Sequence, residues 1–507
     1  MSESNGNAYE YFVERHVREG RGGRLAFVDP WGSLTYAELA DRSARFASGL
    51  RREGIERERR IALVMLDTVD FPIAFWGALR AGVIPVPINT LLPPDITGYI
   101  LADSRAAALV ISAPLLPPLR AAARRAGRVI VSNPDGGNCG FSQLLDNNPA
   151  PIAECSPDEV AFWLYSSGST GNPKGVRHVH SSLQATADTY GAHVLGIRPD
   201  DVMFSVAKLF FAYGLGNSMT FPMAVGATTV LYPDRPTPEA VFAIMRQHCP
   251  TIFGGVPTLY ASLLADPELG PGAGSDRLRR CISAGEPLPE HIGVRWRERV
   301  GTDILDGIGS TEMLHIFLSN RPDDIRYGTT GKPVPGYDVR ILDTGGEVAD
   351  GEPGELVVRG ASAADGYWNQ RQKSRHTFRG EWTHTGDTYT RDADGYYRYC
   401  GRSDDMLKVG GIWVSPFEVE EALIGHQAVL EAAVVGQADS DGLIKPRAIV
   451  VLQQSAPRDD LAAMTEALQN HVKASIGVWK YPRWIEFRDD LPKTATGKIQ
   501  RYKLRAD

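Results

Sequence analysis

The sequence lacks any apolar run long enough for a membrane-spanning helix, which needs about 18 to 20 residues. Its first residues, MSESNGNAYEYF, are polar and contain no hydrophobic stretch of the kind that secretion signals carry. We therefore expect a protein that contacts no membrane and works in the cytoplasm.

Cysteine and positive charge are also in short supply. The 507 residues include 5 cysteines, and no two of them stand in CxxC spacing. Such scattered cysteines fit a reducing compartment and offer no zinc-binding pattern. The formal net charge of −7 argues against a general surface for nucleic acid.

Short apolar runs alternate with helix-like segments in the first part of the chain. We expect strands at residues 60–66, 83–88, 107–111, 160–165, 227–231, 251–254 and 304–306, and helices at 70–82 and 95–102. This alternation predicts parallel βαβ units in a layered α/β domain. Ligand sites in such sheets form where the carboxyl ends of strands open into loops.

From about residue 328, the sequence pattern changes to shorter units that are typical of β-strands and turns. A domain-sized stretch then follows, with helices expected at 416–424 and 461–475 and strands at 431–435 and 447–452. Because 507 residues are too many for one core, we expect at least two domains. The predicted fold is α/β: an N-terminal domain over 1–403, with layered α/β subdomains and a smaller β-rich one, then an α+β domain over 404–507.

The chain is organised around residues 163–175, WLYSSGSTGNPKG, which follow a predicted strand. Glycines allow close backbone approach, and successive loop N–H groups can converge on an anion. Hydroxyl groups and one lysine complete a site suited to polyphosphate, although the segment does not match the P-loop pattern. The alternative interpretation is a flexible Ser/Gly linker. The candidate residues are Ser166, Ser167, Gly168, Ser169, Thr170, Gly171 and Lys174.

Three further segments carry candidate chemistry. Residues 306–312, DGIGSTE, bring carboxylates beside hydroxyl groups, which suits Mg²⁺ bound to phosphate, or form a turn in which Ser310 or Thr311 merely caps. Asp387, in Thr-Gly-Asp, is suited to ribose hydroxyls or to an Asx-turn, and Arg402 to a nearby contact or a surface ion pair. Lys498, in PKTATGK, is either a mobile catalytic ammonium or a solvated lysine.

Together and in this order, these motifs resemble the adenylate-forming superfamily of acyl-CoA synthetases, carrier-loading adenylation domains and luciferases. Within it, the likeness is greatest to bacterial benzoate–CoA and 4-hydroxybenzoate–CoA ligases. The resemblance runs from about residue 26 to 505. It is carried by KLFFAYGLGN (208–217), SAGEPLP (283–289), DGIGSTEMLHIFLSN (306–320), YGTTGKPVPGY (327–337), DDMLKVGGIWVSPFE (404–418) and LPKTATGKIQR (491–501).

The resemblance implies an ATP-dependent aryl-acid–CoA ligase that uses ATP, Mg²⁺ and CoA and passes through an acyl-adenylate. Thr170 and Glu312 would serve the metal, and Lys498 would act in adenylation. The remaining ATP-binding residues would be the loop 166–174, then Gly285, Glu286, Pro287, Asp306, Gly307, Ile308, Gly309, Ser310, Thr311, Asp387 and Arg402.

The resemblance also implies a mobile C-terminal domain with its hinge at Asp404, which rotates to bring Lys408, Gly410, Gly411 and Trp413 toward CoA. The implied aryl-acid pocket comprises Phe211, Ala212, Tyr213, Gly214, Ala284, Gly285, Ile308, Gly309, His315 and Ile316. Phe211 and Ile308 depart from the His and Tyr common in relatives and favour a flat, uncharged ring, or simply pack in a core.

Several alternatives stay open at this point. Benzoate and 4-hydroxybenzoate are not distinguished, because His315, Tyr213 or a backbone group could each pair with a ring hydroxyl. A stand-alone enzyme that loads an aryl acid onto a carrier protein shares the first half-reaction. A luciferase-like oxygenase and an inactive nucleotide-binding regulator are further possibilities. A homodimer and a lysine acetyltransferase acting on Lys498 are possible partners; nucleic acid and membrane are not expected.

Overall fold

The computed structural model describes residues 6–133, 140–145, 148–166, 172–403, 405–409, 412–440, 443–493 and 499–505, with the backbone alone at 408, 412, 413 and 502. The chain forms two compact units. The first comprises Met1–Asp338 with Val358–Thr383, and the second Val339–Val357 with His384–Asp507. None of the helices in the described stretches has the length and apolar content that crossing a bilayer requires.

The first unit contains a fully parallel sheet in the order β4-β3-β5-β6. Its strands are β3 (Arg60–Val64), β4 (Ile84–Pro87), β5 (Ala108–Ser112) and β6 (Val129–Ser132). The helices of this region are α2 (Tyr36–Arg52), α3 (Asp70–Ala81), α4 (Pro94–Asp103), α5 (Leu116–Ala123) and α6 (Gly140–Leu145), with η2 (Ala113–Leu115). α2 begins at a capping box in which Thr35 and Glu38 satisfy each other's backbone N–H groups.

A larger sheet, with nine strands in the described residues, has the order β15-β14-β13-β12-β11-β9-β10-β1-β2 and is parallel from β13 to β1. Its strands are β1 (Leu25–Asp29), β2 (Gly32–Thr35), β9 (Val202–Ser205), β10 (Thr228–Val230), β11 (Ile252–Gly255), β12 (Arg280–Ser283), β13 (Ile304–Gly309), β14 (Ile316–Ser319) and β15 (Lys332–Pro333). The predicted alternation of strands and helices is thus present.

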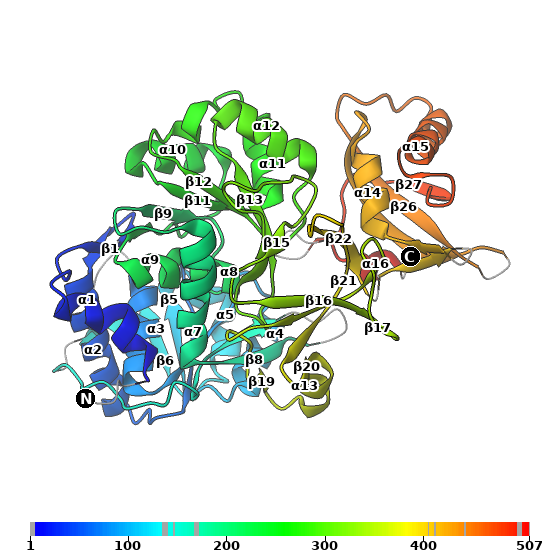
Figure 1. Ribbon diagram of the computed structural model, residues 1–507. Helices are drawn as coiled ribbons and strands as arrows, with labels where there is room; N and C mark the ends of the chain where they lie inside the picture. The colour runs from blue at the N-terminus through cyan, green and yellow to red at the C-terminus, as the bar shows by residue number, and fades with distance from the viewer. Residues whose placement is uncertain are drawn as a thin grey trace. The chain divides into compact units, whose positions relative to one another are not determined.

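Three helices cover one face of this sheet (Figure 1): α10 (Pro238–His248), α11 (Pro257–Ala265) and α12 (Glu290–Val300). They bury a continuous apolar core against the strands, in which Trp296, Tyr260 and Phe253 are fully enclosed. The other helical segments of the unit are η1 (Glu10–Glu14), α1 (Arg15–Arg18), α7 (His180–Thr186), η3 (Ala187–Leu195), α8 (Ala212–Leu215), η4 (Gly216–Thr220), α9 (Phe221–Val225), η5 (Pro271–Gly274) and α13 (Arg371–Thr377).

A three-stranded sheet in the order β19-β8-β7 carries the segment around which the sequence is organised. β7 (Val160–Ser166) and β8 (Lys174–Val179) are antiparallel neighbours, and β19 (Gly366–Tyr367) pairs with β8 from much later in the chain. β20 (Phe378–Arg379) forms a short hairpin with the start of β21 (Trp382–Arg391).

The second unit contains antiparallel strands and an α+β portion. Its β-rich part comprises β16 (Asp338–Asp343), β17 (Gly346–Glu347), β18 (Gly354–Arg359), β21 and β22 (Tyr397–Arg402). β23 (Leu407–Val409), β24 (Ile412–Val414), α14 (Pro416–Ile424), β25 (Val429–Ala438), β26 (Ile444–Leu452), α15 (Leu461–Ile476), β27 (Trp484–Phe487) and α16 (Arg501–Arg505) follow. The helices and strands predicted between 416 and 475 are confirmed, and the domain boundary at Asp404 stays a prediction.

Candidate active site

The carboxyl ends of two neighbouring parallel strands form one edge of the candidate site. β12 ends at Ser283, β13 runs on to Gly309, and the register pairs Ser283 with Asp306. Gly285 has a φ of +95°, which side-chain-bearing residues rarely adopt. A Cβ at Gly309 would lie 2.4 Å from the His315 carbonyl oxygen, so a larger residue would clash. The predicted nucleotide segments 284–287 and 306–309 therefore leave adjacent strands at the same edge.

Asp306 is a buried carboxyl group rather than an exposed anion. Its residue is 5% exposed, and Oδ1 has no hydrogen-bond partner among the described residues. Burial raises the pKa of Asp306 well above its usual range. Of the two carboxyl groups in the 306–312 segment, that of Asp306 is buried, whereas the side chain of Glu312 is 16% exposed and lies beside Lys174.

The hairpin of β7 and β8 brings two predicted phosphate-binding residues together. Ser166 ends β7, Lys174 begins β8, and the two are direct partners in the antiparallel register. Ser167, Gly168, Ser169, Thr170 and Gly171, which connect them, lie outside the described residues. The predicted roles of those five residues stay predictions.

Glu312 contacts the polar side chains of Ser166 and Lys174 in this hairpin. Its Oε1 lies 3.8 Å from Lys174 Nζ and accepts a hydrogen bond from Ser166 Oγ at 3.4 Å. Tyr367, on β19, donates its hydroxyl proton to the same Oε1 at 2.8 Å and accepts from Lys174 Nζ at 3.3 Å. The side chains of Lys174 and Glu312 are 19% and 16% exposed. A carboxylate oxygen beside a lysine fits a site for Mg²⁺, because this ion binds through one or two carboxylates together with substrate phosphates.

Tyr367 is the residue of this cluster that the sequence did not reveal. A tyrosine at this position carries no specific signal in the sequence, and its placement depends on the pairing with Val176 on β8, 191 residues earlier (367 − 176). The neighbouring Thr311 is fixed through its backbone, because His178 Nε2 donates to its carbonyl oxygen at 2.8 Å. Ser310 Oγ accepts from Met313 N at 3.1 Å, which matches the capping alternative for that residue.

The opposite side of the 312–315 segment is aromatic and uncharged. His315 is 2% exposed and is surrounded by the rings of Tyr190, Tyr213 and Phe221, with centroid distances of 5.1, 5.7 and 4.5 Å. Its Nε2–H donates to the Tyr213 carbonyl oxygen at 3.3 Å. Burial lowers the pKa of His315 to about 3, so the ring is neutral at pH 7.

This arrangement fixes the His315 tautomer. Because a carbonyl oxygen only accepts, the proton is on Nε2 and Nδ1 is an acceptor. Nδ1 is buried and has no hydrogen-bond partner in the described part of the chain. A buried acceptor of this kind is suited to a hydroxyl group of a ligand.

The other predicted aryl-site residues lie around the same edge. Phe211, Ala212 and Tyr213 are half-buried at the start of α8, and Ile308 is half-buried near the end of β13. Partial exposure places Phe211 and Ile308 outside the fully enclosed core. Gly214 and Ile316 are buried, with Ile316 opposite Gly309 in the register. After β12, Ala284 is buried, Gly285 exposed, and Glu286 and Pro287 half-buried.

In the second unit, the structure joins two further predicted residues. Asp387 on β21 faces Arg402 on β22 in the register, and Arg402 Nη1 donates to Asp387 Oδ1 at 3.1 Å. The Asp387 side chain is 13% exposed and that of Arg402 43%. The ion pair predicted as the simpler interpretation of Arg402 is present, and their contacts to ribose stay predictions.

The remaining predicted residues are only partly described. Lys408 and Trp413 are backbone partners in the hairpin of β23 and β24. Asp404, Gly410, Gly411 and Lys498 lie outside the described residues. Next to Lys498 in sequence, Arg501 forms a two-bond ion pair with buried Glu420, at 3.0 and 2.5 Å.

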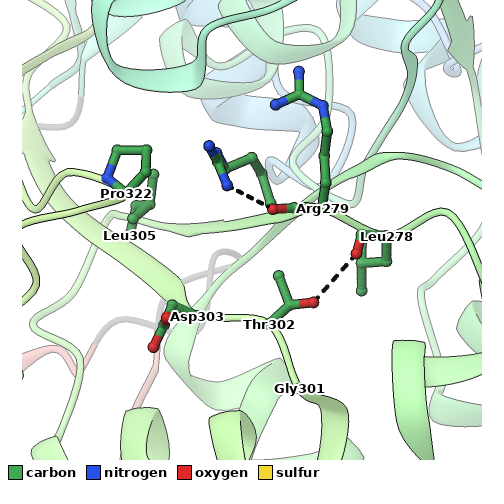
Figure 2. Close-up of a pocket in the computed structure, with 8 residues that line it drawn as sticks. Leu278, Arg279, Gly301, Thr302, Asp303, Leu305 and Pro322 are labelled. Carbon is green, nitrogen blue, oxygen red and sulfur yellow. Dashed lines mark hydrogen bonds between the residues drawn. The ribbon is translucent and has the colours of Figure 1, made fainter.

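The cavity in Figure 2 lies at the other ends of the same strands. Its volume is about 230 Å³, and Leu278, Arg279, Thr302 and Asp303, which precede β12 and β13, contribute to its lining. Figure 2 shows the hydrogen bond that Thr302 Oγ1 donates to the Leu278 carbonyl oxygen at 3.3 Å. Arg279 Nε donates a hydrogen bond to Asp201 Oδ1. This cavity is therefore separate from the candidate active site.

The fold and these clusters are typical of a nucleotide-using enzyme, with a hairpin that carries Lys174 and Ser166 beside Glu312 and an aromatic cluster around His315. Comparison with known proteins agrees. Residues 13–368 match the family described as AMP-binding enzyme, and residues 418–498 match its AMP-binding enzyme C-terminal domain.

Relatives match along nearly the whole chain. A 4-hydroxybenzoate–CoA/benzoate–CoA ligase of Rhodopseudomonas palustris is 55% identical, covering 98% of this chain and 94% of the relative. A benzoate–CoA ligase of Thauera aromatica is 53% identical, covering 99% and 96%. The crystal structure of a benzoate CoA ligase from Burkholderia xenovorans LB400 has a TM-score of 0.91 at 52% identity, covering 98% and 99%.

This chain therefore belongs to the AMP-binding enzyme family. The family resemblance and the α/β fold class predicted from the sequence are confirmed. So is the expectation that the protein is an enzyme of the AMP-forming ligase class, with ATP, Mg²⁺ and CoA as its cofactor and co-substrates.

Proposed function

We propose that this chain is an ATP-dependent aryl-acid–CoA ligase, which converts an aromatic carboxylate, ATP and CoA into an aryl-CoA thioester, AMP and pyrophosphate. The observation that carries the proposal is the four-residue segment 312–315, which joins two unlike environments. At one end, Glu312 meets Lys174 and Ser166. At the other, neutral His315 lies among aromatic rings.

In the first half-reaction, a carboxylate oxygen of the acid attacks the α-phosphorus of ATP, and the bond to the β-phosphate breaks with loss of pyrophosphate. Lys174 and Ser166 bind the departing phosphates, together with the loop 167–171. Glu312 and Thr170 would hold Mg²⁺, which would neutralise phosphate charge when bound. Lys498 stabilises negative charge at the carboxylate and the α-phosphate.

In the second half-reaction, the CoA thiolate attacks the carbonyl carbon of the aryl-adenylate. The carbon–oxygen bond to the phosphate breaks, and AMP leaves. The hinge at Asp404 and the segment that carries Lys408, Gly410, Gly411 and Trp413 serve this step. A change in a few backbone dihedral angles at Asp404 is enough to reorient a domain.

The proposed substrate class is a small aromatic acid with an uncharged ring. Half-buried Phe211 and Ile308 and the neutral His315 give apolar surroundings, in which a charged ring substituent would lose its hydration. The names of two relatives that are 55% and 53% identical point to benzoate and 4-hydroxybenzoate. His315 Nδ1 supports acceptance of the 4-hydroxyl group, which would donate to it.

The proposal extends to the cell. The scattered cysteines support a cytoplasmic location. A homodimer is a further proposal, as is acetylation of Lys498 by a lysine acetyltransferase, which would remove the charge that adenylation needs.

The test is aryl-CoA formation with benzoate, 4-hydroxybenzoate, 2-aminobenzoate, cyclohexanecarboxylate and acetate, run beside ATP–pyrophosphate exchange. Thioester from one or two aryl acids is the expected result. Exchange without thioester would identify a carrier-loading enzyme instead. Silence in both assays would refute the proposed activity.

A further inference from the structure

Tyr367 is a buried tyrosine whose hydroxyl group lies inside the charged cluster. The residue is 4% exposed and belongs to β19, where it is the register partner of Val176 on β8. Its backbone N–H donates to Ser374 Oγ at 3.0 Å, and its ring packs on Phe378 with a centroid distance of 5.4 Å. Backbone and ring are therefore both fixed, which gives the hydroxyl group a defined position.

The hydroxyl group lies between a cation and an anion. A phenol has one proton, and Tyr367 donates it to Glu312 Oε1 at 2.8 Å. The lone pairs then face Lys174 Nζ at 3.3 Å, and Thr377 Oγ1 lies at the same distance. Lys174 Nζ also lies 4.3 Å from the centre of the Tyr367 ring. The lysine thus contacts both the face and the oxygen of this tyrosine.

This placement has a consequence for Glu312. Two donors, Ser166 and Tyr367, converge on Oε1, and in the described residues Oε2 accepts no hydrogen bond. Lys174 Nζ stays 3.8 Å from the carboxylate, about 1 Å beyond a direct charge-assisted hydrogen bond. Ser166 and Tyr367 therefore fix the orientation of the carboxylate, and Lys174 makes no direct hydrogen bond to either of its oxygens.

We propose that Tyr367 is a positioning residue for the metal and phosphate site. It orients Glu312 so that this carboxylate would hold Mg²⁺, and it keeps Lys174 Nζ 3.8 Å from Glu312 Oε1, beyond the length of a direct charge-assisted hydrogen bond. When Mg·ATP arrives, Lys174 would serve the phosphates and Glu312 the cation. This inference rests on the proposed function and adds a residue to it.

The test compares Tyr367→Phe with Tyr36→Phe. Tyr36 is also fully buried in the first unit, and its hydroxyl group donates to the Ala227 carbonyl oxygen at 2.8 Å, so both variants lose one buried hydroxyl group. Binding of Mn²⁺ to each enzyme with α,β-methylene-ATP is followed by electron paramagnetic resonance. Because hydrogen bonds to charged groups are the stronger kind, we expect Mn²⁺ to bind about tenfold more weakly to Tyr367→Phe and unchanged to Tyr36→Phe. Equal affinities in wild type and Tyr367→Phe, or equal losses in both variants, would overturn the inference.

A second variant separates positioning from a general loss of fold. In a Lys174→Met background, the lysine ammonium group that could approach Glu312 is absent. Adding Tyr367→Phe to this variant should therefore weaken Mn²⁺ binding less than it does in the wild type. An undiminished effect would contradict the role assigned to the lysine contact. ATP–pyrophosphate exchange in the wild type is measured in parallel. Its absence would refute the proposed function, whereas exchange with unaltered Mn²⁺ binding in Tyr367→Phe would refute only the role of Tyr367.

Discussion

The two ends of the segment 312–315 solve opposite electrostatic problems. At Glu312, a cation, an anion and a hydroxyl group contact one another, and the side chains of Lys174 and Glu312 are 19% and 16% exposed. At His315, a titratable ring is held neutral by burial among aromatic side chains. Four consecutive residues thus provide two environments, one suited to a highly charged nucleotide and one suited to a flat aromatic ring. Charge is retained where solvent and partners remain, and it is removed where both are excluded.

The largest expected effect comes from removing the anion at the charged end. Glu312→Gln keeps the shape but loses the carboxylate charge, and we expect ATP–pyrophosphate exchange to fall about a hundredfold to a thousandfold. Glu290→Gln, on the exposed first turn of α12, is the matched control and should be unchanged. If Glu312→Gln kept ATP–pyrophosphate exchange within a few-fold of the wild type, the Glu312 carboxylate would not be needed for adenylation.

The next effect tests whether a further positive charge is needed only while ATP reacts. Lys498→Gln should lower ATP–pyrophosphate exchange about a hundredfold and spare thioester formation from supplied aryl-adenylate. Lys493→Gln, in the same lysine-containing motif, loses an ion pair with Glu431 instead and should spare both reactions. Full exchange in Lys498→Gln would contradict the predicted role of this lysine.

The neutral end should reveal itself in the pH dependence of stability. The pKa of His315 is about 3 in the folded protein and 6.5 ordinarily, so between these values the unfolded chain binds the extra proton. Stability is therefore lost as the pH falls below 6.5. Between pH 7 and 5, the wild type should lose about 2 kcal/mol more free energy of unfolding than His315→Phe. Urea unfolding at the two pH values measures this, and equal losses would mean that His315 is not held neutral.

The smallest effect concerns substrate choice. His315→Phe keeps an aromatic ring but removes the Nδ1 acceptor, so activity with benzoate should change little. Activity with 4-hydroxybenzoate should fall about tenfold in kcat/KM, the value of one buried hydrogen bond. Parallel kinetics with both acids measure the difference. Equal losses for both would show that Nδ1 does not pair with the ring hydroxyl group.

Much of the fold could be predicted because its signals are local. The buried strand Arg60–Val64 and the helix Asp70–Ala81 each have a clear periodicity, and turn residues separate them. The strand predicted at 160–165 is likewise encoded in consecutive residues, whereas its antiparallel pairing with β8 was not predicted. Glu312 stands out because it follows a glycine-rich strand end.

The rest depends on contacts between distant segments. Tyr367 reaches Glu312 only because β19 pairs with β8. The raised pKa of Asp306 arises from burial at the sheet edge, and the polar residues of the motif give no sign of that burial. The ring cage of His315 combines Tyr190, Tyr213 and Phe221 from three helical segments, whose packing is a tertiary property.

Under the proposed function, the charged end of segment 312–315 at Glu312 and its neutral end at His315 serve one reaction on an aromatic acid. The most direct measurement is the product stoichiometry with benzoate, ATP, Mg²⁺ and CoA, resolved by chromatography. The account predicts one benzoyl-CoA, one AMP and one pyrophosphate for each benzoate consumed, with no thioester from acetate. ADP in place of AMP, or thioester formation that favours acetate over benzoate, would contradict it.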